Sequence, residues 1–204
     1  MQKINNNINH FNKINSKYQE EYIWILDFLP YGHEFDTKYS HLKKPILQVI
    51  GEDYFTLLEV EPKENKIPPL SSKLKLNNDE FINYIKCRIS YDKLSRGSKI
   101  ELPIILEKIV KSKEEKFIDF FNKSQPLSSR MNSLELIPGI GKKLMWNIIN
   151  ASKKNPFITF EDLKKRVPSY RDPEKNIVKR IILELNGNQK YNIFVPSIKK
   201  ENNI

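Results

Sequence analysis

The stretch LIPGIGKKLMWNII, Leu136–Ile149, decides how the C-terminal half of this chain folds. The chain has 204 residues and only 6 Gly, yet Gly139 and Gly141 stand one residue apart, directly before Lys142 and Lys143. Two glycines flanking an apolar residue, followed by a basic amphipathic segment, match the helix-hairpin-helix pattern of two short helices joined by a tight turn. Such a turn needs positive φ, which glycine adopts without strain. The lack of Cβ at both positions also lets another backbone approach closely.

This pattern predicts an anion site. Ile140 is expected to anchor the turn in the core, while the amides of the turn and of the next helix N-terminus face outward. The helix dipole reinforces such a site, which suits a nucleic-acid phosphate. Lysines beside it add mobile positive charge. The candidate nucleic-acid-binding residues are Pro138, Gly139, Ile140, Gly141, Lys142, Lys143, Arg171, Lys175, Lys179 and Arg180. The alternative is that the glycines make only a tight structural turn.

A faint repeat supports the second half of that residue set. RVPSYRDPEKNIVKRII repeats the order apolar, Pro, turn, basic residue and amphipathic helix, but without the glycines. Its basic residues are Arg166, Arg171, Lys175, Lys179 and Arg180. Two interpretations stay open: they form an ordinary solvated helix face, or they extend the phosphate track beside the turn.

The positive charge is unevenly distributed along the chain. The net charge is +10, but residues 1–110 carry 16 Lys+Arg against 15 Asp+Glu, whereas residues 111–204 carry 19 against 10. A general lysine bias would raise both halves alike, so the asymmetry indicates a polyanion-binding C-terminal half.

Composition shifts divide the chain into four segments. Residues 1–19 are Asn-rich and predict a disordered tail. Residues 20–112 contain short apolar runs with tight turns, which predict a small β-barrel of the oligonucleotide/oligosaccharide-binding (OB) type with a trailing helix. Residues 113–190 predict a helix-hairpin-helix domain, and residues 191–204 a C-terminal strand or tail. The expected fold class is therefore α+β, an OB-like barrel followed by a helical domain.

Local signals give several specific expectations. Gly51 is expected to supply positive φ between two strands, and Pro103 to occupy the first turn of a helix. Ser128 or Ser129 is expected to cap a short helix with Met131, Leu134 and Ile137 on one face, ended by Pro138. Thr159 and Asp162 resemble a capping box. Pro173 fits the first position of the last helix.

A family resemblance rests on longer stretches. WILDFLPYGH, QVIGEDYFTLLEVEP, RISYDKL, FIDFFNKS and SLELIPGIGKKLMWNII occur in an order that resembles the archaeal DUF655 family, from about residue 20 to about residue 195. The resemblance implies an OB-like domain, a helix-hairpin-helix domain, and an RNA-binding role linked to translation or ribosome biogenesis. It implies no catalytic site.

Other residues are weighed against ordinary structural roles. The 3 His and the single Cys87 show no metal-ligand spacing, so His33 with Asp36 and His41 is not expected to bind a metal. Possible OB-surface contacts are Tyr31, His33, Lys43, Lys44 and Tyr54. Of Tyr54 and Phe55, at least one should be buried, because alternate strand residues face the core. Trp24 is expected in the core. Trp146 is expected to contact the first domain or to lie exposed near the turn.

These observations predict a non-catalytic nucleic-acid-binding protein without cofactor or metal. RNA is favoured over DNA only through the family resemblance, and ribosomal or rRNA-processing components are the expected partners. A protein–protein adaptor is the alternative. A repair enzyme is less favoured, because Asp162 falls in an apparent helix cap and the Gly-rich loop of such enzymes is missing. Without a signal-like N-terminus or a membrane-length apolar run, a cytoplasmic location is expected.

Overall fold

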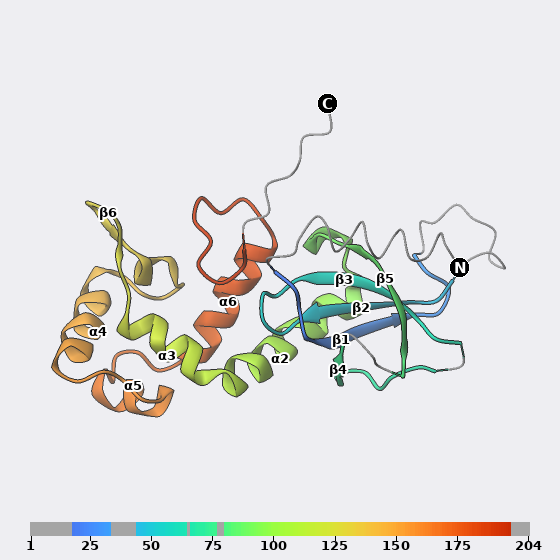
Figure 1. Cartoon of the computed structure of the whole chain (residues 1–204). Helices are drawn as coiled ribbons and strands as arrows, with labels where there is room; N and C mark the ends of the chain where they lie inside the picture. Colours follow the sequence, from blue (N-terminus) through green and yellow to red (C-terminus); the bar gives the residue numbers. More distant parts are fainter. Residues whose placement is uncertain (1–17, 34–43, 65, 77–79, 197–204) are drawn as a thin grey trace. The chain divides into compact units, whose positions relative to one another are not determined.

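The computed structural model describes residues 18–33, 44–64, 66–76 and 80–196, and within them the chain has an α+β fold (Figure 1). A five-stranded antiparallel sheet precedes five α-helices in the described part of the chain. The chain forms two compact units: one includes the sequence up to Ile105 and from Leu185 onward, and the other spans Leu106–Glu184. The boundary falls within helix α2, Arg96–Ser112.

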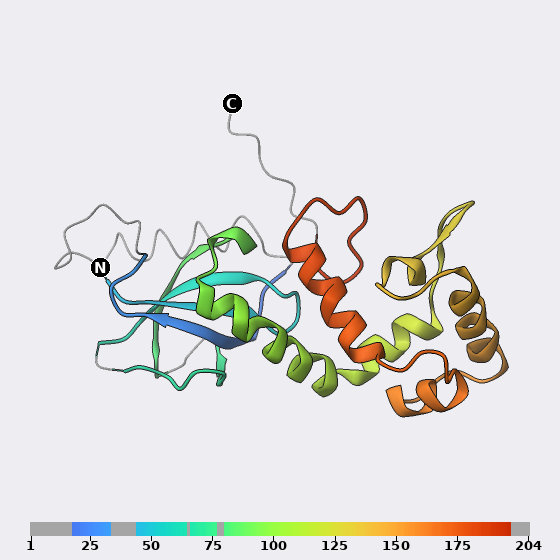
Figure 2. The same ribbon diagram turned by 180° about the vertical axis from the view of Figure 1, so that it is seen from behind.

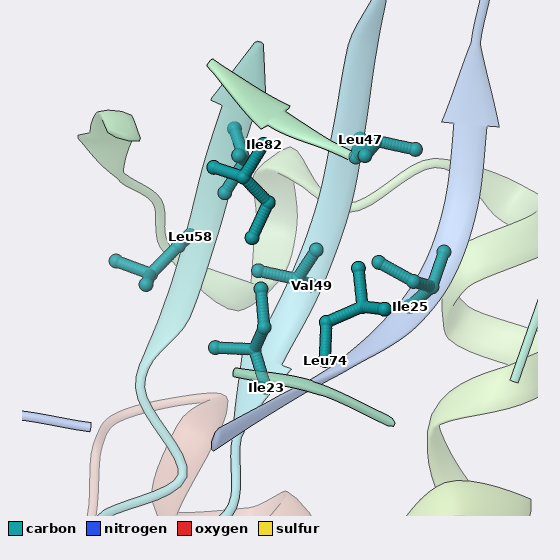
Figure 3. Close-up of a cluster of buried hydrophobic side chains, with 8 residues drawn as sticks. Ile23, Ile25, Leu47, Val49, Leu58, Leu74 and Ile82 are labelled. Atoms are coloured by element: carbon teal, nitrogen blue, oxygen red, sulfur yellow. The ribbon is translucent and has the colours of Figure 1, made fainter. Parts of the chain in front are cut away.

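The sheet of the first unit curls around an apolar core. Its strands are β1 (Tyr22–Leu29), β2 (Ile46–Gly51), β3 (Leu57–Pro62), β4 (Lys73–Lys75) and β5 (Ile82–Arg88), in the order β4-β1-β2-β3-β5. Leu74 of β4 and Ile82 of β5 lie on the two edge strands, yet both pack in one cluster with side chains of β1, β2 and β3 (Figure 3). The sheet therefore bends far enough to bring its edges toward a common core.

The opposite face of the sheet is also buried, and it carries polar side chains among apolar ones. Gln48 and Glu59 alternate with core residues of β2 and β3 and are almost fully buried. The Gln48 carbonyl oxygen accepts bonds from the Ser95 amide and the Ser98 hydroxyl, both 2.8 Å long. The Ser95 hydroxyl accepts the Ser98 amide at 2.9 Å, as an N-cap does. These bonds fix the start of α2 on the sheet. Figure 2 shows from behind the first turns of this helix, in green, lying over the strands.

The β2–β3 connection is built around a buried carboxylate. Glu20 accepts backbone bonds from Asp53 (2.8 Å), Tyr54 (3.1 Å) and Thr56 (3.0 Å). A Cβ on Gly51 would lie 2.0 Å from the Glu20 carboxyl carbon. The expectation of positive φ at Gly51 was wrong: the left-handed residue is Phe55, with φ 58°. Glycine is required at position 51 because the carboxylate occupies the space of a side chain.

Helix α2 begins earlier than its proline suggested. Pro103 lies inside α2 rather than in its first turn, so that prediction was wrong. The helix starts seven residues before the proline because Ser95 caps it and Gln48 holds the cap to the sheet. Helix α3, Glu114–Asn122, follows and buries Phe117, Ile118 and Phe121.

The segment before the glycine pair differs most from expectation. Instead of a helix capped by Ser128 or Ser129, the chain forms two short paired strands, β6 (Pro126–Ser128) and β7 (Met131–Asn132), and the 3-10 helix η3 (Ser133–Leu136). Asn132 caps η3 and Glu135 completes its capping box. Leu134 and Ile137 are buried as expected, but Met131 is 39% exposed.

The remaining helices follow the sequence pattern closely. They are α4 (Lys142–Lys154), α5 (Phe160–Arg166) and α6 (Pro173–Leu185), with Pro173 at the first helical position as predicted. The Thr159 hydroxyl accepts the Asp162 amide at 3.1 Å, but the Asp162 carboxylate accepts the Ile158 amide instead of completing the box.

Both chain ends lie partly outside the described residues. The predicted N-terminal tail falls almost entirely there, as do positions 197–204. Positions 191–196, which are described, form no strand. Among the described residues, no helix combines the length and apolar character needed to cross a membrane.

Candidate nucleic-acid interface

The turn between η3 and α4 is anchored from inside. The Ile140 amide donates to the Ile137 carbonyl at 3.1 Å, and the Ile137 amide donates to Leu134 at 3.0 Å. Ile140 is 5% exposed, so its side chain holds the turn in the core as predicted. Gly139, Gly141, Lys142 and Lys143 around it are exposed. The turn therefore presents main chain and lysines to solvent while its apolar residue faces inward.

The start of α4 leaves its amides without acceptors. The first helical bond runs from the Met145 amide to the Gly141 carbonyl, 2.9 Å long, and no side chain caps the helix. Within the described residues, the amides of Gly141, Lys142, Lys143 and Leu144 have no hydrogen-bond acceptor. Unpaired N–H groups at a helix N-terminus, with the positive end of the dipole, favour an anion.

The two glycines of the turn have different roles. Gly139 has φ +90°, a conformation that favours glycine, and a Cβ there would lie 3.2 Å from the Asn176 amide nitrogen. Gly141 has φ −89° and ψ 175°, ordinary extended backbone, and a Cβ there would meet nothing within 4 Å. The positive φ expected of the turn is therefore present at Gly139 and not at Gly141. Its side toward solvent is open.

Two side chains of helix α6 contact the turn and the residue before it. Asn176 packs against Gly139, and the Arg180 guanidinium donates to the Leu136 carbonyl at 3.1 Å. Arg180 is 3% exposed and pairs with the buried Glu184 at 2.7 Å. The prediction of Arg180 as a phosphate ligand was wrong, because this side chain is buried and holds the chain just before the turn.

The other predicted basic residues are exposed. Lys142 and Lys143 form no ion pair with any described residue, and neither do Arg171 and Lys179. Lys175 lies 3.8 Å from the Asp172 carboxylate, an exposed pair that adds little stability. Lys175 and Lys179 stand one turn apart on the same side of α6. Five cations thus stay available to a polyanion.

Arg166 has a structural role. Its guanidinium donates to the carbonyls of Ala151 and Asn155 at the end of α4 and lies 4.5 Å from the Phe157 ring centre. It also pairs with Asp162 at 3.1 Å. Of the two interpretations of the basic repeat, neither fits Arg166, which satisfies the last carbonyls of α4.

Comparisons with known proteins place this architecture in a family. The model of the family described as "Protein of unknown function (DUF655)" matches residues 19–196. The chain belongs to the DUF655 family.

Two archaeal relatives of this DUF655 chain extend the match. The Methanocaldococcus jannaschii protein named "Uncharacterized protein MJ0038" is 35% identical over 180 residues, which cover 86% of this chain and 80% of the relative. The crystal structure of Af1531 from Archaeoglobus fulgidus, also of the DUF655 family, is 43% identical with a TM-score of 0.81. The match covers 87% of this chain and all of that one. The fold and family are thus shared over most of the chain.

The predicted contacts in the first unit of this DUF655 protein are mostly engaged with β3. His33 lies 2.5 Å from the Glu59 carboxylate, and Lys44 lies 3.1 Å from Glu61. Glu61 also accepts the Tyr84 hydroxyl at 2.7 Å, which raises the pKa of Tyr84 to about 12. These carboxylates compete with any external anion, so this surface is a weaker candidate than the turn.

The aromatic candidates divide between surface and core. Tyr31 is 72% exposed. Phe55 is buried, which confirms the prediction that at least one of Tyr54 and Phe55 is buried. Tyr54 is half-buried and packs edge-on against Tyr18, with ring centres 5.2 Å apart. Trp24 is also half-buried. Lys43 lies outside the described residues.

The residues weighed for metal binding and for a repair enzyme have structural surroundings in the described part of the chain. No group of three or more His, Cys, Asp and Glu side chains in the described ranges could hold a metal ion. Asp162, the aspartate weighed for a repair enzyme, is engaged by Arg166 and the Ile158 amide.

The sequence analysis missed two side chains of α6 that support the turn. Asn176 was not singled out, and Arg180 was assigned to phosphate binding instead of to the Leu136 carbonyl. Their spacing of four residues puts them on one side of α6, and this was the available signal. Near them, burial raises the pKa of the Tyr170 hydroxyl. The sequence could not show that this side of α6 meets the turn.

Proposed function

We propose that this DUF655 protein binds nucleic acid without catalysis, holding backbone phosphates at the turn formed by Pro138–Lys143. The observation that carries the proposal is the set of four acceptor-free amides, Gly141 to Leu144, on an exposed turn beside Lys142 and Lys143. Main-chain amides and lysines contact phosphates, which carry no base identity. Binding at the turn itself is therefore sequence-independent and sensitive to salt.

The finer fold assignments belong to this proposal. We assign the second unit as a helix-hairpin-helix module whose first helix is reduced to η3, with α4 as the second. The first unit is assigned as an OB-like barrel, supported by five antiparallel strands whose two edge strands share one core. In this assignment the barrel adds a second contact surface, on which Tyr31 is exposed.

RNA is the favoured polymer because the family resemblance implies it, together with a link to translation. Ribosomal RNA fragments are therefore the first natural targets to test. RNA and DNA of the same sequence should be compared directly, because a turn that contacts only phosphates does not itself distinguish the two sugars.

The test is a double charge reversal at the turn. Lys142→Glu with Lys143→Glu should weaken binding to a labelled RNA duplex by roughly 10- to 100-fold at about 0.1 M salt. The affinity of the wild type should fall with salt with a log–log slope of roughly −3 to −5, as for about three to six phosphate contacts. The slope of the variant should be shallower. Fluorescence anisotropy titrations measure both quantities.

A matched control separates the turn from overall charge. Lys63→Glu with Lys66→Glu changes two exposed lysines of the first unit by the same total charge and should alter affinity less than threefold at the same salt, because few counterions are released there. Equal losses in both double variants would show non-specific attraction. Unchanged binding in the Lys142/Lys143 variant would move the site elsewhere. No binding by the wild type would favour a protein–protein adaptor.

A further inference from the structure

The exposed side of α4 combines an aromatic ring with cations and amides. We call it the α4 outer face; it comprises Lys142, Lys143, Trp146, Asn147, Asn150, Lys153 and Lys154, all exposed. Helix α4 contains no Asp or Glu. Trp146 follows Lys142 by four residues and Lys143 by three, so it stands one turn above the phosphate-binding end. The face is therefore positive along its length, with a flat ring near its middle.

Trp146 is an unusual residue for an exposed helix face. Its side chain is 55% exposed, although tryptophan has one of the largest apolar surfaces of any residue. Among the described residues, no aromatic ring or cation is stacked on it. The buried side of α4 is formed by Met145 and Ile148 instead. In this unit the indole ring of Trp146 is thus exposed, with no described aromatic ring or cation stacked on it.

A hollow lies along the same helix, and the residue after Trp146, Asn147, lines it. Its volume is about 560 Å³, within the range of small-ligand sites. Asn147, Asn150 and Lys154 of α4 line it, together with Pro168 and Ser169 from the segment between α5 and α6. The side-chain amides of asparagine donate and accept hydrogen bonds, as the edges of nucleobases do. The hollow therefore combines apolar walls with amide groups and a lysine, and it is large enough for a planar ring.

We infer that the α4 outer face binds an unpaired, single-stranded segment of nucleic acid, with one base stacked on Trp146 and its neighbour in the hollow. The inference rests on the proposed function, because the turn holds the phosphate that brings the strand to the ring. Four residues of helix span about 6 Å, a distance that one nucleotide bridges. Base–aromatic stacking tolerates any sequence, whereas paired bases in a duplex keep their faces covered.

An acidic protein partner would also be attracted by four lysines. An exposed indole on the same helix face as two asparagine amides fits a planar base with polar edges better than it fits carboxylate side chains, which present no ring to stack. Single-stranded nucleic acid is therefore the occupant that the face favours, and an acidic polypeptide serves as a comparison in the test.

The test uses the full chain and its two tryptophans. With Trp24→Phe, emission reports Trp146 alone, and a twelve-nucleotide oligouridine should quench it while a duplex of equal length should not. In anisotropy titrations, Trp146→Ala should weaken oligouridine binding roughly 5- to 150-fold and duplex binding less than twofold. Trp146→Phe should retain most of the affinity for oligouridine. Ile158→Ala, at an apolar residue 77% exposed in the same unit, should change neither.

The outcomes separate this inference from the proposed function. If Trp146→Ala leaves oligouridine binding unchanged while the Lys142/Lys143 variant loses it, the turn binds phosphates but the stacking inference is wrong. If neither variant affects binding, the proposed function fails first. Quenching of Trp146 by polyglutamate at concentrations where oligouridine has no effect would overturn the inference in favour of an acidic protein partner.

Discussion

At the scale of single residues, the turn shows how one motif assigns two glycines to different tasks. Gly139 is required by its backbone, because φ +90° strains any other residue, and a Cβ there would also lie only 3.2 Å from the Asn176 amide nitrogen. Gly141 is free of both constraints, with an extended backbone and open space on its outer side. It occupies the N-cap position of α4, where glycine contributes no capping bond. The absence of a cap leaves the amides of the next three residues available to a ligand.

Replacing Gly141 should therefore move stability and binding in opposite directions. In Gly141→Asp and Gly141→Asn the new side chain accepts from the α4 amides, which should raise the free energy of unfolding by roughly 0.3 kcal/mol. The same bond occupies the anion site, so affinity for RNA should fall. Urea denaturation and anisotropy titrations measure the two effects.

Because asparagine adds no charge, loss of binding in Gly141→Asn would identify the amides themselves as ligands. If Gly141→Asn is more stable and still binds RNA like the wild type, then the amides of α4 take no part in binding.

At the scale of elements, sequence periodicity predicted α4, α5 and α6 well, because each has a stop or start signal and one apolar side. The prediction from periodicity failed where a proline follows soon after the residue that caps the helix. Only five residues separate the cap Asn132 from Pro138. Because a proline disfavours helical backbone at the residue before it, here Ile137, the segment is too short for an α-helix. It forms the single 3-10 turn η3 instead. The α2 start was missed because its partner Gln48 is distant in sequence.

Helix α6 illustrates a role that no local pattern reveals. Arg180→Met should lower the free energy of unfolding by about 3 kcal/mol, because it removes the cation facing buried Glu184 and the bond to the Leu136 carbonyl. Removing both charges with Arg180→Met and Glu184→Met should recover much of that loss. Urea denaturation of the three proteins measures the difference.

The neighbouring exposed Lys179 offers a control for the loss of a charge on α6. Lys179→Met should stay within about 0.5 kcal/mol of the wild type. A change in Arg180→Met that is no larger than the change in Lys179→Met would contradict a structural role for Arg180.

At the scale of the whole molecule, the two units differ in charge. The positive excess lies in residues 111–204, which contain most of the unit with the turn and α4. The first unit is nearly neutral over residues 1–110, and beside its apolar core it buries polar groups such as Glu20. The burial of the polar residues of β2 and β3 could not be predicted. The alternation of residue types along a strand does not show whether both faces of its sheet are covered.

The division predicts local effects of mutation. Glu20→Ala should destabilise the first unit by about 3 kcal/mol, because the amides of Asp53, Tyr54 and Thr56 lose a buried charged acceptor. Hydrogen exchange should speed up at those amides and stay unchanged in α4, α5 and α6. Glu21→Ala, at an exposed neighbour with one ion pair of 3.4 Å to Lys75, should have no measurable effect. Faster exchange throughout α4–α6 in Glu20→Ala would show that the two units unfold together.

The support of the turn by α6 has a consequence for biosynthesis. The bond from Arg180 to the Leu136 carbonyl joins residues 44 positions apart, so a nascent chain exposes the glycine turn well before its clamp has left the ribosome. Until then the turn has its lysines but not the side chains that fix its shape. The turn thus takes its final shape only after α6 has emerged and Arg180 can reach the Leu136 carbonyl.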